Sequence, residues 1–64
     1  MTGEDVYVNN IENGLKALRL KSKTPKDTNI AVNLNKLKTV NEGLYQDYLT
    51  KYKKALEAYN EAKQ

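Results

Sequence analysis

The chain has 64 residues, of which 39% are hydrophobic and 30% are charged, and its net charge is +3. A chain this short forms one domain at most and buries only about 60% of its unfolded surface, so its own core gives marginal stability. It contains no cysteine and no histidine, which excludes disulfide bridges and removes the usual thiolate nucleophile, imidazole base and zinc ligands. We therefore expect residues 1–64 to form one small domain that is not an enzyme and holds neither a metal nor a cofactor.

The N-terminal segment, residues 5–21, is compatible with two secondary structures. Four apolar residues recur at the spacing of a helix face, namely Val8, Ile11, Leu15 and Leu18. Asn13-Gly14, however, is the dipeptide most typical of a two-residue β-hairpin turn. Because an isolated hairpin is marginal in water and residues 15–20 are good helix formers, helix is the favoured prediction. An N-terminal β-hairpin is the less favoured alternative.

Pro25 marks the clearest break in the pattern. Proline disfavours a helical conformation at the preceding Thr24 but is accepted in the first turn of a new helix. Thr24 and Asp27 also match a capping pattern at the start of a helix. The sequence therefore predicts a second helix that begins near Pro25.

The continuity of this second helix depends on residues 39–43. They contain another Thr-x-x-Glu pattern and a glycine, which would give a break and a three-helix bundle. The apolar stripe nevertheless keeps its helical phase across Gly43, at about 100° per residue. The favoured prediction is an all-α helical hairpin with one long amphipathic C-terminal helix over about residues 26–63, kinked near Asn41–Gly43. A three-helix bundle is the alternative.

The second half of the chain carries an apolar stripe rich in leucine and tyrosine. A first helix that folds back from Pro25 covers only the first half of a long second helix, so the tyrosine half needs another partner. Tyrosine is enriched at protein interfaces because its ring buries a large area while its hydroxyl stays satisfied. The predicted protein interface consists of Leu44, Tyr45, Tyr48, Leu49, Tyr52, Leu56 and Tyr59. The alternative interpretation is the protein's own core, which suits a three-helix bundle better.

The positive charge is concentrated in the middle of the chain. Residues 1–15 carry three acids and no base, whereas residues 16–38 carry seven bases and one acid. The candidate nucleic-acid contacts in this Lys16–Lys38 patch are Lys16, Arg19, Lys21, Lys23 and Lys26. Arg19 is the one arginine of the sequence, and no nucleic-acid-binding motif accompanies the patch. The ordinary interpretation of such a charge run is a solvated face.

Together these features predict a non-catalytic protein-interaction or assembly protein, of the adaptor or accessory type found in phages and mobile elements. It would self-associate through its C-terminal Leu/Tyr face, as a coiled-coil dimer or higher oligomer, and bind a protein partner. The alternative is a small basic nucleic-acid-binding protein. The acidic N-terminus and the lack of a run of about 20 apolar residues predict a cytoplasmic protein with no membrane contact. We expect no small-molecule substrate.

Overall fold

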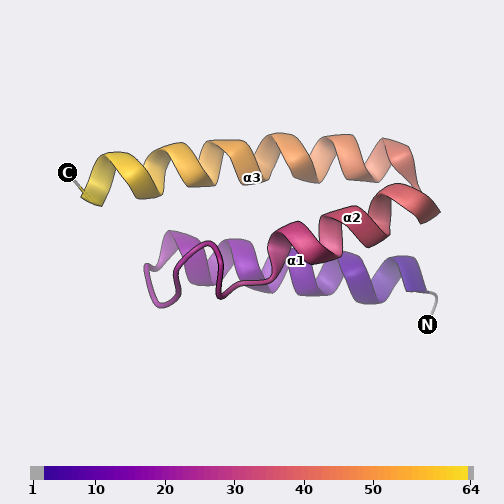
Figure 1. Cartoon of the computed structure of the whole chain (residues 1–64), viewed down its shortest axis with the longest axis horizontal. Helices are drawn as coiled ribbons and strands as arrows, with labels where there is room; N and C mark the ends of the chain where they lie inside the picture. Colours follow the sequence, from indigo (N-terminus) through magenta and orange to yellow (C-terminus); the bar gives the residue numbers. More distant parts are fainter. Residues whose placement is uncertain (1–2, 64) are drawn as a thin grey trace.

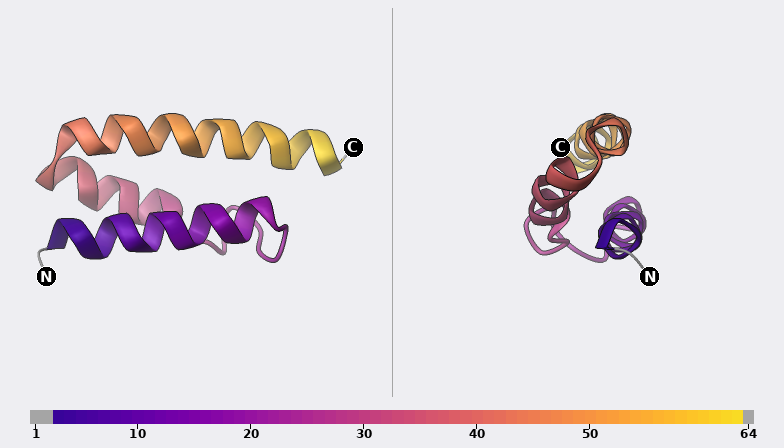
Figure 2. Two further views of the ribbon diagram at one scale, coloured as in Figure 1. Left: turned by 180° about the vertical axis from the view of Figure 1, so that it is seen from behind. Right: turned by 90° about the vertical axis from the view of Figure 1, so that its right-hand side faces the viewer.

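The computed structural model describes residues 3–63, with side chains through residue 61. This part of the chain forms α1 (Gly3–Arg19), α2 (Ile30–Val40) and α3 (Glu42–Lys63). Helices α1 and α3 run in the same direction and α2 runs against both (Figure 1). Each helix contacts the other two, and α2 lies to one side of the α1–α3 pair (Figure 2). The all-α prediction is confirmed, and the arrangement is the three-helix alternative.

The dipeptide Asn13-Gly14 lies inside α1, so the hairpin alternative does not apply, and no strand occurs within residues 3–63. Gly14 is buried against α2. A Cβ atom at this position would lie 2.6 Å from Cγ1 of Ile30 and 3.2 Å from Cβ of Thr28. The glycine therefore permits the close approach of α1 and α2 instead of forming a turn.

The chain leaves α1 through a tight C-terminal cap. Lys21 adopts a left-handed conformation with φ of 58°. The Ser22 amide donates to the Ala17 carbonyl at 3.0 Å, and the Lys21 amide donates to the Leu18 carbonyl at 3.1 Å. These two bonds are those of a Schellman motif, which satisfies the last carbonyls of a helix. Leu20, between the helix and the left-handed residue, is left 70% exposed.

Helix α2 begins at Ile30, five residues later than predicted. The amides of Asp27 and Thr28 donate to Thr24, so the predicted cap forms, but it closes only a single turn. The Thr28 hydroxyl donates to the Pro25 carbonyl at 2.7 Å and lies 3.4 Å from the Ile30 amide, from which it accepts. Asn29 is left-handed, with φ of 58° and ψ of 20°. A helix cannot continue through that conformation, and the next one starts immediately after it.

The predicted long helix over residues 26–63 is divided at Asn41, which is extended, with φ of −152° and ψ of 96°. Its amide donates to the Leu37 carbonyl at 2.7 Å and closes α2. Its side-chain Oδ1 accepts from the Leu44 amide at 3.1 Å, as the N-cap of α3. Its Nδ2 donates to Glu4 Oε1 of α1 at 2.8 Å. One residue therefore ends α2, starts α3 and links both to α1.

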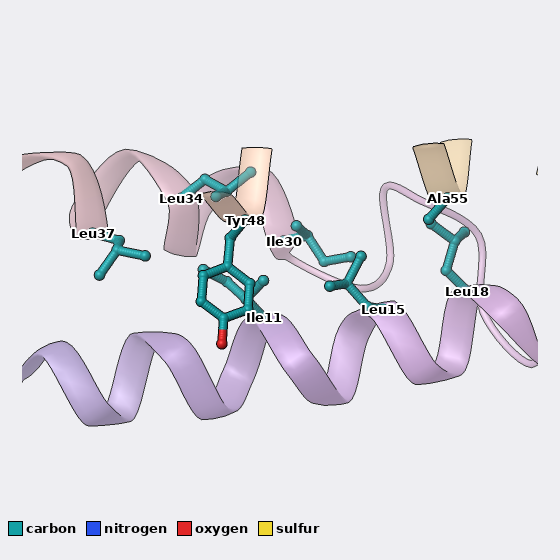
Figure 3. Packing of buried hydrophobic residues seen from close by; sticks show 8 residues of the cluster. All are labelled: Ile11, Leu15, Leu18, Ile30, Leu34, Leu37, Tyr48 and Ala55. Atoms are coloured by element: carbon teal, nitrogen blue, oxygen red, sulfur yellow. The ribbon is translucent and has the colours of Figure 1, made fainter. Parts of the chain in front are cut away.

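The core lies where the three helices meet, and each helix contributes to it (Figure 3). Its buried apolar residues are Ile11, Leu15 and Leu18 from α1, Ile30, Leu34 and Leu37 from α2, and Tyr48 and Ala55 from α3. This buried cluster is small, as expected for so short a chain, and partly buried residues of α3 pack against it and widen it. The described helices include none that is long and apolar enough to cross a lipid bilayer.

Candidate binding groove between α1 and α3

A groove with a volume of about 450 Å³ lies between α1 and α3. No residue of α2 contributes to it, in agreement with the position of α2 to one side of the α1–α3 pair (Figure 2). Its lining residues are Glu12, Leu15, Lys16, Arg19, Leu20, Tyr48 and Lys51. Residues more than 30 positions apart in the sequence therefore form one surface.

The floor of the groove is apolar. Leu15 is buried and Tyr48 is 9% exposed, so both belong to the core and to the groove at once. Leu20 differs from them because the Schellman cap leaves it 70% exposed, more than any other large apolar side chain that the structure describes. The groove therefore has a buried apolar base and one solvent-facing apolar side chain at its edge.

The hydroxyl of Tyr48 is tied to α1. It donates a hydrogen bond of 2.6 Å to Glu12 Oε1. This bond, together with burial and the negative charges of Glu12 and Asp47, raises the pKa of Tyr48 from 10.0 to about 12. At neutral pH the phenol is therefore protonated, and it occupies one oxygen of the only acidic side chain that lines the groove.

Three cationic side chains border this floor. Lys16 and Arg19 lie exposed in the last turn of α1. Lys51 of α3 places Nζ at 4.8 Å from the centroid of the Tyr48 ring, a cation–π geometry that favours this position of the ammonium group. These three positive charges outnumber the single carboxylate of Glu12, so the groove carries a net positive charge.

The Tyr48–Glu12 bond should make stability fall at high pH. Below pH 10 the phenol is protonated in both the folded and the unfolded chain, so the full contribution is present. Between pH 10 and 12 the unfolded chain loses this proton while the folded chain keeps it, and stability falls. We expect Tyr48→Phe to cost about 1 kcal/mol at pH 8. We expect that cost to be about 1 kcal/mol smaller at pH 11 than at pH 8. This decrease is less than the pKa shift alone would give, because the hydroxyl borders an open groove where solvent screens the interaction.

Urea unfolding of the wild type and Tyr48→Phe, followed by circular dichroism between pH 8 and 11, measures this difference. Other titrating groups are common to both chains and cancel. Glu12→Gln provides the second comparison, because it removes the charge and keeps an oxygen acceptor. A cost of Tyr48→Phe that stays constant up to pH 11 would contradict the hydrogen bond.

The seven residues of the predicted protein interface lie on α3 and pack against the chain's own core. Tyr48 is buried, and the other six are half-buried beside it. Tyr48 alone among them lines the groove. This packing agrees with the alternative interpretation of the stripe, as part of the protein's own core. Self-association through these residues stays a prediction.

The five predicted nucleic-acid contacts are all exposed at the end of the bundle where α1 leads into α2. They do not line one common hollow. Lys16 and Arg19 line the groove, whereas Lys23 lines a polar hollow with Asn10, Asn13, Asn29 and Asn33. Arg19 also borders, with Lys21, a small hollow against Tyr59 of α3.

The sequence pattern did not predict that Leu20 and Lys51 would line this groove. A signal for Leu20 was present, because Leu18 and Leu20 are two positions apart and fall on nearly opposite sides of a helix. Burial of Leu18 therefore leaves Leu20 outside the core. Lys51 gave no such signal, since a lysine on the polar side of an amphipathic helix is the ordinary arrangement.

Within the described residues, no three or more acidic side chains gather in a way that could hold a metal ion. Comparison with known proteins finds no family model, no curated protein and no solved structure that matches this chain.

Proposed function

We propose that this chain is a small, non-catalytic protein-interaction module that binds a protein partner through the groove between α1 and α3. The observation that carries the proposal is Leu20, 70% exposed at the edge of a hollow whose floor is Leu15 and Tyr48. A single exposed leucine is ordinary on a protein surface. Here it stands beside a tyrosine ring and an arginine, two residue types that are enriched at binding hot spots, and it adds apolar surface that a partner can cover.

The groove is a better candidate than the predicted tyrosine stripe. A partner that bound the stripe would have to compete with the chain's own core, against which six of the seven stripe residues already pack half-buried. The groove is open in the folded chain, so a partner can enter without unpacking the core. Most preorganised interfaces change their backbone little on binding.

Site-specific photo-crosslinking in cells that produce the protein tests this proposal. A photoreactive amino acid replaces Lys16 at the groove or, as the matched control, Val40, which is 53% exposed and does not line the groove. We expect a discrete protein adduct at position 16 and none at position 40, and we expect Leu20→Ser to abolish the adduct. Equal adducts at both positions, or an adduct that survives Leu20→Ser, would contradict the proposal.

The mass of the purified chain separates this proposal from self-association. Light scattering gives about 7.3 kDa for a monomer. A larger mass that returns to the monomer value in Tyr52→Glu would support assembly through the predicted stripe. A larger mass that returns to the monomer value only in Leu20→Ser would mean that the groove's protein partner is a second copy.

Nucleic-acid binding is the second candidate, favoured by the five exposed basic residues at one end of the bundle. Such binding weakens steeply with salt because phosphate neutralisation releases counterions. Substitution of Lys21, Lys23 and Lys26 by glutamine should then weaken it, while Leu20→Ser should not. The absence of binding at low salt would eliminate this candidate.

A further inference from the structure

We infer that the ligand of the groove is an acidic amphipathic helix of the partner protein, which lies along α1 and α3 on the side opposite α2. This inference rests on the proposed function and adds the chemistry of the partner. It follows from three properties of the groove, namely its charge, its backbone and its apolar floor.

The charge of the groove selects an anionic ligand. Lys16, Arg19 and Lys51 line it, and their only acidic companion, Glu12, already accepts the Tyr48 hydroxyl. Lys51 Nζ lies 4.8 Å from the centroid of the Tyr48 ring, which places its positive charge beside the floor of the groove. Arg19 offers the planar pair of donors that matches a carboxylate. A basic ligand would be repelled, and such like-charge contacts are a main source of specificity.

The backbone around the groove selects a helix instead of an extended peptide. A peptide that binds by strand addition needs an open sheet edge with free amides and carbonyls. Both walls of this groove are helices, whose backbone groups are bonded internally. A helical ligand satisfies its own backbone and needs only side-chain contacts, so it fits these walls.

The apolar floor selects an amphipathic ligand. Leu15 and Tyr48 form a fixed base, and the exposed Leu20 gains most from being covered. The groove's volume of about 450 Å³ is in the range of ordinary ligand pockets, so it accepts more than one large side chain. In the end-on view α2 occupies one side of the α1–α3 pair (Figure 2). An acidic helix on the other side would complete a four-helix arrangement.

Fluorescence anisotropy with the full chain tests the inference. The probe is a labelled helical peptide of about five turns with leucines spaced i, i+4 and i+7 on one face and glutamates beside them. One control peptide has the same composition with its leucines distributed around the helix. A second replaces every glutamate with lysine. We expect saturable binding of the amphipathic acidic peptide alone.

Variants of the chain locate the binding. Leu20→Ser should weaken it at least about tenfold, the scale of truncating an interface anchor. Lys16→Gln with Lys51→Gln should weaken it about fivefold and reduce its salt dependence. The matched controls are Val40→Ser, an exposed apolar residue elsewhere, and Lys23→Gln with Lys26→Gln, two charges outside the groove. Both controls should bind as the wild type does.

Several outcomes would overturn the inference: no binding of the acidic amphipathic peptide, equal binding of either control peptide, or indifference to Leu20→Ser. If these occur while the crosslink at position 16 still depends on Leu20, the proposed function stands and the acidic ligand class is wrong. If the crosslink also fails, both are wrong. Binding of a single-stranded DNA probe that depends on Lys23 and Lys26, but not on Leu20, would favour a nucleic-acid partner instead.

Discussion

Gly14→Ala should destabilise the chain by about 2 kcal/mol, even though alanine is the better helix former by about 1 kcal/mol. The added Cβ would lie 2.6 Å from Ile30 Cγ1 and 3.1 Å from Ile30 Cδ1. Ile30 is completely buried, so its side chain cannot move aside without separating α1 from α2. For a chain of this length, whose total stability is of the order of 3–10 kcal/mol, the loss is a large share. Urea unfolding followed by circular dichroism measures it.

Gly43→Ala is the matched control. Gly43 is also helical, in the first turn of α3, but it is exposed and a Cβ there would meet only Asn41 Oδ1, at 3.4 Å. We expect this variant to be more stable than the wild type by about 0.5 kcal/mol through helix propensity. If both glycine variants changed stability equally, the close contact between α1 and α2 would be refuted. In a double-mutant cycle with Ile30→Ala, the cost of Gly14→Ala should largely disappear.

Asn41→Ala should cost about 2 kcal/mol, since it removes the N-cap of α3 and the bond to Glu4 together. The cap is the bond from the Leu44 amide to Asn41 Oδ1 at 3.1 Å, and the bond to Glu4 Oε1 is 2.8 Å long. Both bonds lie at the turn that joins α2 to α3, so their loss also loosens this turn. Chemical denaturation of the variant, with helix content read from circular dichroism, gives the cost.

Two single variants separate the two bonds of Asn41. Asn41→Ser keeps an oxygen that can cap α3 and loses the contact with α1. Glu4→Ala keeps the cap and removes that contact, together with one acidic charge in the first turn of α1. Each should cost about half as much as Asn41→Ala. Two results would contradict this role of Asn41 at the turn between α2 and α3. One is that Asn41→Ala has no effect on stability, and the other is that neither Asn41→Ser nor Glu4→Ala shows any part of the loss.

The helical class of the fold followed from the sequence, because the periodicity of Ile11, Leu15 and Leu18 is strong and local. The change of chain direction at Asn41 could not be predicted from the sequence in the same way. Leu37 and Leu44 are seven residues apart, the spacing of two helical turns, although they lie on helices that run in opposite directions. A helical wheel assumes one axis, so it cannot distinguish a continuous stripe from two stripes that face a shared core.

The role of Gly14 was hidden for a related reason. Asn13-Gly14 has the composition of a turn, and only the packing of Ile30 against it identifies a close approach of two helices. In the same way, a tyrosine-rich face has one pattern whether its partner is another molecule or the rest of the same chain. The groove could not be predicted, because Leu20 and Lys51 line one hollow only once α1 and α3 are placed side by side.

The most direct test of the groove is a nitrogen–proton correlation spectrum of the full chain, recorded as the acidic amphipathic peptide is added. We expect the largest chemical-shift changes on the groove residues of both sides, namely Leu15, Lys16, Arg19, Leu20, Tyr48 and Lys51. The Asn10–Asn33 side of the bundle should change little. Changes confined to Lys21–Lys26, or centred on Leu49, Tyr52 and Leu56 of α3, would contradict a binding groove between α1 and α3.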